Sequence, residues 1–520
     1  MSSSTPNILF VMADQLGASA LPIYGHKVVK APNIERLAAG GTVFENAYCN
    51  SPLCSTSRVS MLSGRLPSEL DAYDNASEFP AAVPTFAHYL RALGYRTCLS
   101  GKMHLVGPDQ LHGYEERLTT DFYPVDFGWT PNWEKQWEKL SFFHNMDSVT
   151  KAGICARSMP IDYDDETTYQ AQRRLYDYAR DQADTRPFFM TVSLTHPHDP
   201  YATTREYWDR YDDSEIDLPS VPHIPPEQRD PHSARLFYHY GMHEQEITDA
   251  DIRKARHAYY GMTSYVDDKL GQLMDTLERT GMADNTIVIF SADHGDMLGE
   301  RGMWYKMSFY EWSASVPFVV RHPDVAGGKR VPQTTSLIDL FPTLVDLAGG
   351  GTPDPECAPH LKGRSVAPLL QGDAAGWPDT AYSEYLGEGA AGPCLMVRKG
   401  RHKYVYSAGE PDSAGDPPQL FDLTDDPQEL DDRAGRSDYA TIEAELGDLV
   451  ARTWDLDNLR KRVVESQKRR RFVFDALSRG KPAPWDYAPS YDAANLYIRN
   501  DEALSAREYR ARLDEPTGAE

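Results

Sequence analysis

The chain has 520 residues, which is enough for one large domain, a smaller second one and a well-buried core. It carries 53 basic side chains (lysine and arginine) and 78 acidic ones, a formal net charge of −25. This balance argues against nucleic-acid binding, which needs a basic face. Because an acidic surface also repels anions at long range, any anion site must be built from local cations.

Cysteine usage and the N-terminal segment bear on where the protein works. The six cysteines are scattered, with no CxxC pair, a pattern typical of a reducing compartment. The segment MSSSTPNILFVMADQ has no basic leader, and Asp14 ends its apolar run, so we expect neither a signal peptide nor a membrane anchor. No later run is long enough to cross a bilayer. We therefore expect a cytoplasmic protein with no membrane or nucleic-acid partner.

Apolar runs along the first two thirds of the chain predict buried strands. They are apolar throughout rather than alternating, which is typical of strands covered on both faces, and they span 7–14, 95–104, 187–196, 286–295 and 315–323. Helical patterns lie between them, the clearest over 262–280 with Gly281 as its stop signal. This alternation predicts an α/β domain with a mostly parallel central sheet flanked by helices.

Polar side chains follow four of these predicted strands. They are Asp14, then Lys102 and His104, then His196 and His198, and finally Asp293 and His294. A single polar residue at a strand end usually just satisfies a loop. Because open α/β sheets bind ligands beyond the carboxyl ends of their strands, four such ends together predict a functional site.

The last third of the chain has a different character. A Gly/Pro-rich stretch at 347–359 predicts a linker or long loop. The segments 394–407 and 418–430 resemble antiparallel strands, and a charged helix is predicted near 438–476, before a tail that runs to 520. We expect two domains, 1–370 and 371–520, the second an α+β subdomain with an antiparallel sheet and an extended tail. The basic run KRRR at 468–471 fits a solvated helix face or a subunit contact.

The segment NSPLCSTSRVSMLSGR, residues 50–65, places Cys54 at the start of a predicted helix. A thiolate nucleophile needs a cation or base to lower its pKa, and Arg58 lies one turn away, so a plain thiol enzyme stays open. The segment also resembles the signature of the type I sulfatases of the alkaline phosphatase superfamily, Cys-x-Pro/Ala-Ser-Arg. That resemblance implies that 1–370 is a catalytic sulfatase domain. It also implies that a maturation enzyme oxidises Cys54 to formylglycine, although Thr56 stands where the signal most often has proline.

The same resemblance implies a divalent metal. Its ligands would be Asp14, Asp293 and His294, together with the side chain derived from Cys54. Gln15 stands where many sulfatases have a second aspartate. Carboxylates with one imidazole favour Ca²⁺, with Mn²⁺ or Mg²⁺ as alternatives.

The resemblance also implies roles for the basic residues near the strand ends. Lys102 and Lys306 would neutralise the sulfate oxygens. His104 would orient the aldehyde hydrate or take its proton, and His198 would donate to the leaving oxygen. Arg58 would hold the hydrate or pair with a metal-bound carboxylate.

Longer segments, among them YDNASEFP, THPHDPY and ESQKRRRFVFDALSRGKPAPWDY, resemble the choline sulfatases over nearly the whole chain. In that subgroup an aromatic face and a carboxylate hold a quaternary ammonium. The matching positions here are Asn75, Trp129, His144, Asn145 and Glu384, with Glu388 as the alternative carboxylate. The function implied is hydrolysis of choline O-sulfate to choline and sulfate.

Two other functions stay open at this point. A phosphonate monoester hydrolase or phosphodiesterase would use a near-identical nucleophile and metal set. A non-catalytic choline- or betaine-binding protein is the alternative of another class, if Thr56 marks lost maturation. The long charged tail beyond residue 460 favours a homo-oligomer in which each subunit embraces its neighbour.

Overall fold

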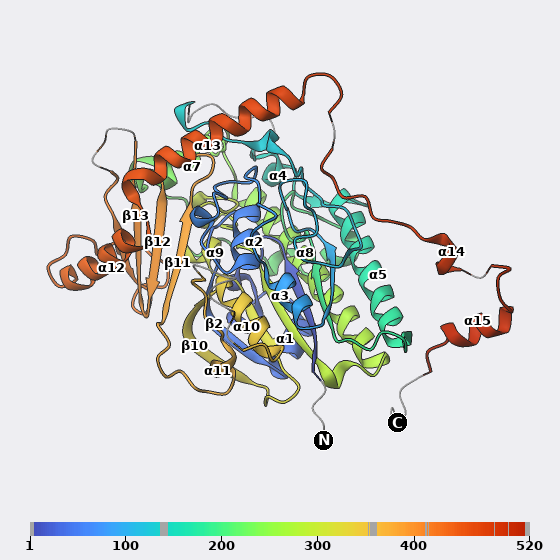
Figure 1. The fold of residues 1–520 in the computed structure, drawn as a ribbon. Helices are drawn as coiled ribbons and strands as arrows, with labels where there is room; N and C mark the ends of the chain where they lie inside the picture. Colours follow the sequence, from blue (N-terminus) through green and yellow to red (C-terminus); the bar gives the residue numbers. More distant parts are fainter. Residues whose placement is uncertain are drawn as a thin grey trace.

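The structure is a computed structural model that describes residues 5–135, 144–351, 353, 361–410, 413, 415–482, 484–497 and 499–514. In this part of the chain the larger sheet has eight strands (Figure 1). In chain order they are β1 (Asn7–Ala13), β2 (Thr42–Tyr48), β3 (Arg96–Gly101), β4 (Glu116–Arg117), β6 (Phe188–Ser193), β8 (Thr286–Ala292), β9 (Phe318–Arg321) and β10 (Lys329–Ser336). Their order across the sheet is β10-β2-β9-β8-β1-β6-β3-β4.

The strands predicted from apolar runs are confirmed. β1 lies inside the sheet, parallel to both β6 and β8, and is buried from Ile8 to Ala13. The sheet is mostly parallel, as predicted, but β9 runs antiparallel to both of its neighbours, β2 and β8. The reason is that the chain leaves the carboxyl end of β8 and turns back at the same sheet edge, without a crossover helix long enough to return it to the other edge.

Two groups of helices flank this sheet. One group contains α1 (Pro32–Ala39), α5 (Met159–Arg180) and α8 (Asp249–Arg279), and the other contains α2 (Cys54–Ser63), α3 (Phe86–Ala92) and α10 (Leu340–Leu347). The predicted helix 262–280 is the second half of α8, which begins at a capping box formed by Thr248 and Asp251. Gly281 has a φ of +69°, as its predicted stop role requires.

The C-terminal part forms a separate antiparallel sheet. Its strands follow one another in sequence order: β11 (Thr380–Tyr385), β12 (Cys394–Lys399), β13 (His402–Ser407) and β14 (Gln419–Asp422). The last three lie in the predicted segments, whereas β11 was not predicted. β11 attaches the sheet to the segment before α2, because Glu384 N donates to Asn50 O at 2.9 Å.

The predicted helix 438–476 is in fact two helices, α12 (Ala440–Thr453) and α13 (Leu456–Leu477). The break falls at Trp454, whose extended backbone lets its indole Nε1 donate to the buried Glu384. Figure 1 shows α13 crossing one end of the molecule, followed by a tail with the short helices α14 (Ala493–Leu496) and α15 (Leu504–Ala511).

The remaining short elements belong mostly to loops at the site edge. They are α4 (Asp147–Thr150), β5 (Gly153–Ile154), β7 (Ala202–Thr203), α6 (Arg205–Trp208), α7 (Pro231–His239), α9 (Glu311–Ala314) and α11 (Ala367–Leu370), with the 3₁₀ turns η4 (Phe127–Trp129) and η5 (Trp133–Lys135). Within the described ranges, no helix combines the length and apolar character that a bilayer crossing requires. The five cysteines in these ranges are free.

Candidate active site

The polar residues that follow the parallel strands meet at one edge of the large sheet. Asp14 follows β1, Lys102 follows β3, and Asp293 with His294 follows β8. α2 begins at the same edge and brings Cys54 to them, so that the donor atoms of Asp14, Cys54, Asp293 and His294 all lie within 4.8 Å of one another. All four side chains are buried.

These four residues fit a divalent cation. His294 Nδ1 lies 3.0 Å from the Gly295 carbonyl, which can only accept a hydrogen bond, so Nδ1 carries the proton and Nε2 presents its lone pair. Nε2 faces Cys54 Sγ at 3.2 Å and the Asp14 carboxylate at 3.8 Å. Burial lowers the pKa of His294 to about 4, which keeps the imidazole neutral. Two carboxylates and a neutral imidazole make a donor set for a hard or borderline cation.

Arg58 organises the carboxylates from behind. Its Nε donates to Asp293 Oδ2 at 2.8 Å, and its Nη2 lies 3.5 Å from Asp14 Oδ2. Its Nη1 donates to the Lys102 carbonyl at 2.6 Å. Arg58 is one turn after Cys54 on α2, where all ten residues are buried. Of the two roles implied by the resemblance, this geometry supports carboxylate pairing.

Cys54 is a poor nucleophile as an unmodified thiol. Burial, reinforced by the nearby Asp14 carboxylate, raises its pKa to about 11. At neutral pH the group is therefore a protonated thiol, although nucleophilic attack by cysteine needs the thiolate. The plain thiol enzyme left open by the sequence is disfavoured.

Two lysines supply positive charge on the open side of Cys54. The Lys102 ammonium pairs with Asp14 and lies 4.2 Å from the centre of the Tyr123 ring. The Lys306 ammonium donates to the Gln15 side-chain carbonyl and lies 2.6 Å from His198 Nε2. Burial lowers the pKa of Lys306, but Cys54 and then the carboxylates of Asp199, Asp14 and Asp293 outweigh this effect, so the net pKa is raised and Lys306 stays charged.

His198 and Lys306 form a hydrogen bond whose donor and acceptor can be assigned. His198 Nδ1 lies 2.7 Å from the Asp199 carbonyl, so Nδ1 carries the imidazole proton and Nε2 accepts from Lys306. Burial and the Lys306 charge hold the pKa of His198 well below its usual range. The movable proton of this pair therefore rests on Lys306. The other histidine of that segment, His196, instead points to Asp164, with 2.6 Å between Nδ1 and Oδ2.

His104 is buried in a strained position. Its φ is +54°, and neither ring nitrogen has a hydrogen-bond partner in the described part of the chain. Its ring lies 5.9 Å from that of Trp129, and burial lowers its pKa to about 3. Strained backbone and an unpartnered neutral imidazole are typical of a group positioned for a ligand.

A pocket of about 330 Å³ opens in front of Cys54. Its lining combines a lysine, two histidines, aromatic rings and carboxylates: Cys54, Asn75, Tyr123, Trp129, His144, Asn145, Asp147, Ser148, His198, Asp199, Pro200, Lys306 and Glu388. Four of the five residues predicted to bind the ammonium group are therefore present.

The fifth, Glu384, is not among the lining residues. Its carboxylate accepts hydrogen bonds from Ser68 N, Ser68 Oγ and Trp454 Nε1, so it ties β11 to the turn at Ser68 and to the junction of α12 and α13 inside the protein. The alternative carboxylate, Glu388, lines the pocket instead. The expectation for Glu384 is corrected accordingly: four residues beyond it the chain has left β11 and turned toward the pocket.

The sequence did not point to Tyr123, Ser148 or Asp199 as pocket residues. The Asp199 carboxylate lies 3.2 Å from His144 Nδ1 and accepts from Ser148 Oγ at 2.9 Å. Burial raises its pKa, but His144 and His198 outweigh that effect and the net pKa is lowered. Asp199 could have been noticed because it directly follows His198, whereas no pattern marks Tyr123.

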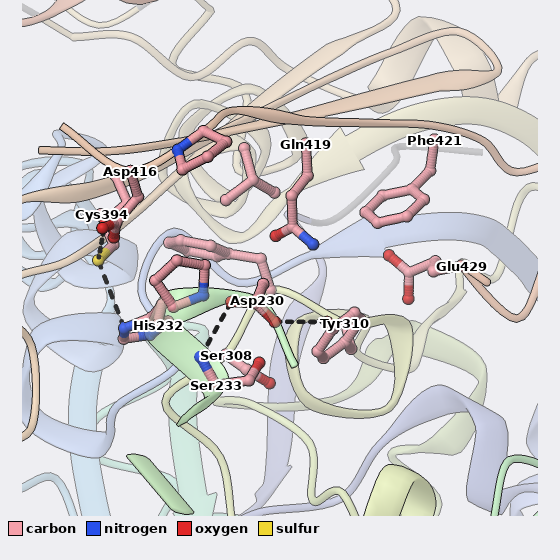
Figure 2. Close-up of a pocket in the computed structure, with 15 residues that line it drawn as sticks. Asp230, His232, Ser233, Ser308, Tyr310, Cys394, Asp416, Gln419, Phe421 and Glu429 are labelled. Atoms are coloured by element: carbon pink, nitrogen blue, oxygen red, sulfur yellow. Dashed lines mark hydrogen bonds between the residues drawn. The ribbon is translucent and has the colours of Figure 1, made fainter. Parts of the chain in front are cut away.

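A second cavity, drawn in Figure 2, lies between α7 and the C-terminal sheet. Its volume is about 20 Å³, room for about one water molecule. His232 Nδ1 and Cys394 Sγ approach to 3.5 Å at its end. It is a packing gap at the contact between the two parts of the chain, too small for a substrate.

Comparisons with known proteins agree with this geometry. Residues 6–350 match the family described as "Sulfatase", 299–455 match "N-sulphoglucosamine sulphohydrolase, C-terminal", and 461–513 match "Choline sulfatase enzyme C terminal". A choline-sulfatase of Rhizobium meliloti is 44% identical over 98% of both chains. An arylsulfatase of Clostridium perfringens is 26% identical, covering 84% of this chain and 91% of its own.

Among solved structures, the phosphonate monoester hydrolase of Agrobacterium radiobacter superposes with a TM-score of 0.68 at 25% identity, covering 86% of this chain and 95% of its own. The sulfatase match covers well over half of the chain, and the family implies both a divalent metal and a formylglycine. On these grounds, the protein belongs to the sulfatase family and hydrolyses sulfate esters.

Proposed function

We propose that the substrate is choline O-sulfate, which the protein hydrolyses to choline and sulfate. The observation that carries this proposal is one pocket lined both by Lys306 and His198 and by Trp129 and Glu388. We assign the part around Lys306 and His198 to the sulfate group (the sulfate end) and the part around Trp129 and Glu388 to the ammonium group (the ammonium end) of a zwitterionic substrate. The 44% identity to a choline-sulfatase over nearly the full length of both chains supports the same substrate.

The ammonium end suits a group that cannot donate hydrogen bonds. Trimethylammonium can be recognised only by aromatic faces and by negative charge. Tyr123 and Trp129 lie 5.4 Å apart at an interplanar angle of 52°. Because the Lys102 ammonium lies over the Tyr123 ring, Trp129 is the aromatic face that we assign to the substrate ammonium. Glu388, buried among the lining residues, supplies the charge.

At the sulfate end, the chain's own residues bind the anion and hold the proton. When present, the divalent cation and the formylglycine at position 54 together supply an acidified hydroxyl as the nucleophile. Lys306 and Lys102 offset the negative charge that builds on the sulfate oxygens. The choline oxygen leaves as a strong base and needs a proton, which the Lys306–His198 pair holds on the Lys306 ammonium and can pass on through His198 Nε2. We assign the neutral imidazole of His104 the role of a base, which its two unpartnered ring nitrogens in the described part of the chain support.

Four finer proposals complete this function. The cation is Ca²⁺, with Mn²⁺ and Mg²⁺ as alternatives, because carboxylate oxygens dominate the donor set. A formylglycine-generating enzyme matures Cys54. The protein acts in the cytoplasm, as its scattered cysteines suggest, and it is a homo-oligomer joined through the tail beyond residue 460. Light scattering on the purified protein tests the last proposal, and a monomer would reject it.

The substrate is tested by comparing kcat/KM for choline sulfate with that for an aryl phosphonate monoester. We expect a higher kcat/KM for choline sulfate. A higher kcat/KM for the phosphonate would instead indicate a phosphonate monoester hydrolase or phosphodiesterase. The peptide mass across residues 50–58 is measured on the same sample. An unmodified Cys54 without turnover, even after co-expression with a maturation enzyme, would favour a non-catalytic choline-binding protein.

A further inference from the structure

The basic run at 468–471 is not a uniform charged face. Lys468 and Arg469 are exposed on α13, whereas Arg470 is only 6% exposed. The buried positions of this helix, Leu459, Val463, Ser466, Gln467 and Arg470, recur every three or four residues. They form one stripe that faces the body of the protein.

The buried guanidinium of Arg470 forms an ion pair with Asp74. Nη1 donates to Oδ1 and Nη2 to Oδ2, each at 2.7 Å, which is the bidentate geometry of the strongest arginine–carboxylate pairs. Nη1 also donates to Thr130 Oγ1 at 3.2 Å, and Nε to Ser466 Oγ at 3.2 Å. Asp74 is fully buried, so the charge of Arg470 is what compensates it.

Both partners of Arg470 stand next to a pocket residue. Asp74 precedes Asn75, and its Oδ1 also accepts from Ala76 N at 3.0 Å, which fixes the turn that carries Asn75. Asn75 Oδ1 in turn accepts from Ser55 N, beside Cys54. Thr130 follows Trp129 at the end of η4. Arg470 therefore supports two residues of the ammonium end, Asn75 and Trp129, from outside the pocket.

The remainder of α13 supports the same wall. Gln467 Oε1 accepts from Trp133 N at 2.9 Å, three residues beyond Thr130. The Phe474 ring packs closely against Gly128: a Cβ atom added to Gly128 would lie only 3.3 Å from ring atoms of Phe474. η4 and η5 thus rest on α13 along its inward stripe.

We propose that Arg470 is a positioning residue for the ammonium end of the pocket, acting through Asp74 and Thr130 on Asn75 and Trp129. This inference rests on the proposed choline O-sulfate activity. Arg470 touches neither Cys54 nor the lysines, and its link to the sulfate end runs only through Asn75 and Ser55 N, so its loss should affect the ammonium end more than the sulfate end. Without Arg470, the negative charge of Asp74 near Glu388 is no longer compensated. That charge would draw the substrate ammonium toward Asp74 and away from Glu388.

The test measures the two ends of the pocket separately. Inhibition constants for choline and for inorganic sulfate are determined with wild type, Arg470→Lys and Asp74→Asn. We expect both variants to raise the choline constant about ten- to a hundredfold, with the sulfate constant changed by less than about twofold. Arg469→Gln, which removes a neighbouring exposed charge from the same helix, is the matched control and should behave as wild type.

Arg470→Lys keeps the charge and loses the bidentate fork, which limits damage to folding. The double variant Arg470→Met/Asp74→Asn removes both charges and covers the case in which a single variant does not fold. If the choline and sulfate constants rise together, or neither changes, the positioning role is wrong. A wild type that hydrolyses an aryl sulfate but neither cleaves choline sulfate nor binds choline would instead reject the proposed substrate, and the role of Arg470 with it.

Discussion

The chemistry depends on one buried side chain, residue 54. Alanine carries no sulfur or oxygen from which a formylglycine aldehyde could form, so Cys54→Ala should lower kcat for sulfate ester hydrolysis by at least about 10³-fold. Steady-state kinetics measures this. Cys155→Ser, a half-buried cysteine away from the site, is the control and should keep wild-type activity. An alanine variant that retains a tenth of the activity would show that the nucleophile lies elsewhere.

If Glu388 faces the substrate ammonium, as we propose, it gives the protein a distinctive pH dependence. Burial raises the pKa of Glu388 to about 7, with Asp74 raising it further and Lys306 opposing that rise. An ammonium group binds the ionised form, so the KM for choline sulfate should rise about tenfold per pH unit as the pH falls below 7. The KM for an aryl sulfate, which has no ammonium group, should lack this component.

The matching variant is Glu388→Gln. It should raise the KM for choline sulfate about tenfold or more at pH 8, since the attraction between the ammonium and a full negative charge is lost. It should also make the pH dependence of that KM the same as for the aryl sulfate. If the difference between the two substrates persists in Glu388→Gln, another group is titrating.

The two candidate carboxylates show how far sequence reasoning reaches at this scale. Both stand in YSEYLGEG, four positions apart, and either could have faced the pocket. The choice depends on Trp454, seventy residues later, whose indole captures Glu384. The strand-end residues Asp14 and Asp293 were easier to foresee, because apolar runs reveal where buried strands end and parallel strands end at one edge.

Among the elements, the junction of α12 and α13 makes a stability prediction. Trp454→Phe removes the indole donor from the buried Glu384, so the free energy of unfolding should fall by about 1–3 kcal/mol beyond the packing cost. Trp377→Phe is the matched control, because Trp377 Nε1 donates to a carbonyl at a half-buried position. Urea unfolding measures both. Equal losses would mean that the Glu384 contact adds nothing.

The same junction explains why one long charged helix was predicted where the structure has two shorter helices, α12 and α13. Nothing in the local pattern of 438–476 opposes a continuous helix, and the tertiary contact of Trp454 breaks it. The direction of β9 is a similar case, because an apolar run predicts a strand but not its orientation. The second half of α8 was predicted correctly since its apolar stripe and Gly281 are both local signals. The domain boundary at 370 stays a prediction.

For the whole molecule, removal of the divalent cation should lower both activity and thermal stability. A ligand that binds only the folded state adds about 2.7 kcal/mol at a hundred times its Kd. A chelator should therefore lower Tm, and added Ca²⁺ should restore it. His294→Ala removes one neutral donor without changing charge, and its Tm should respond much less to either treatment. An identical response in this variant would place the cation elsewhere.

The burial of α2 sets an order of events during synthesis. Cys54 is only 2% exposed once α2 is enclosed, so an oxidising enzyme can reach it only before the chain around it has folded. The central strand β1 waits for β8 to complete its pairing, more than 200 residues after Cys54 leaves the ribosome. At about 5–20 residues per second that interval lasts on the order of ten to fifty seconds. If a maturation enzyme oxidises Cys54, as we propose, the speed of translation should help to set how much active enzyme a cell obtains from each messenger RNA.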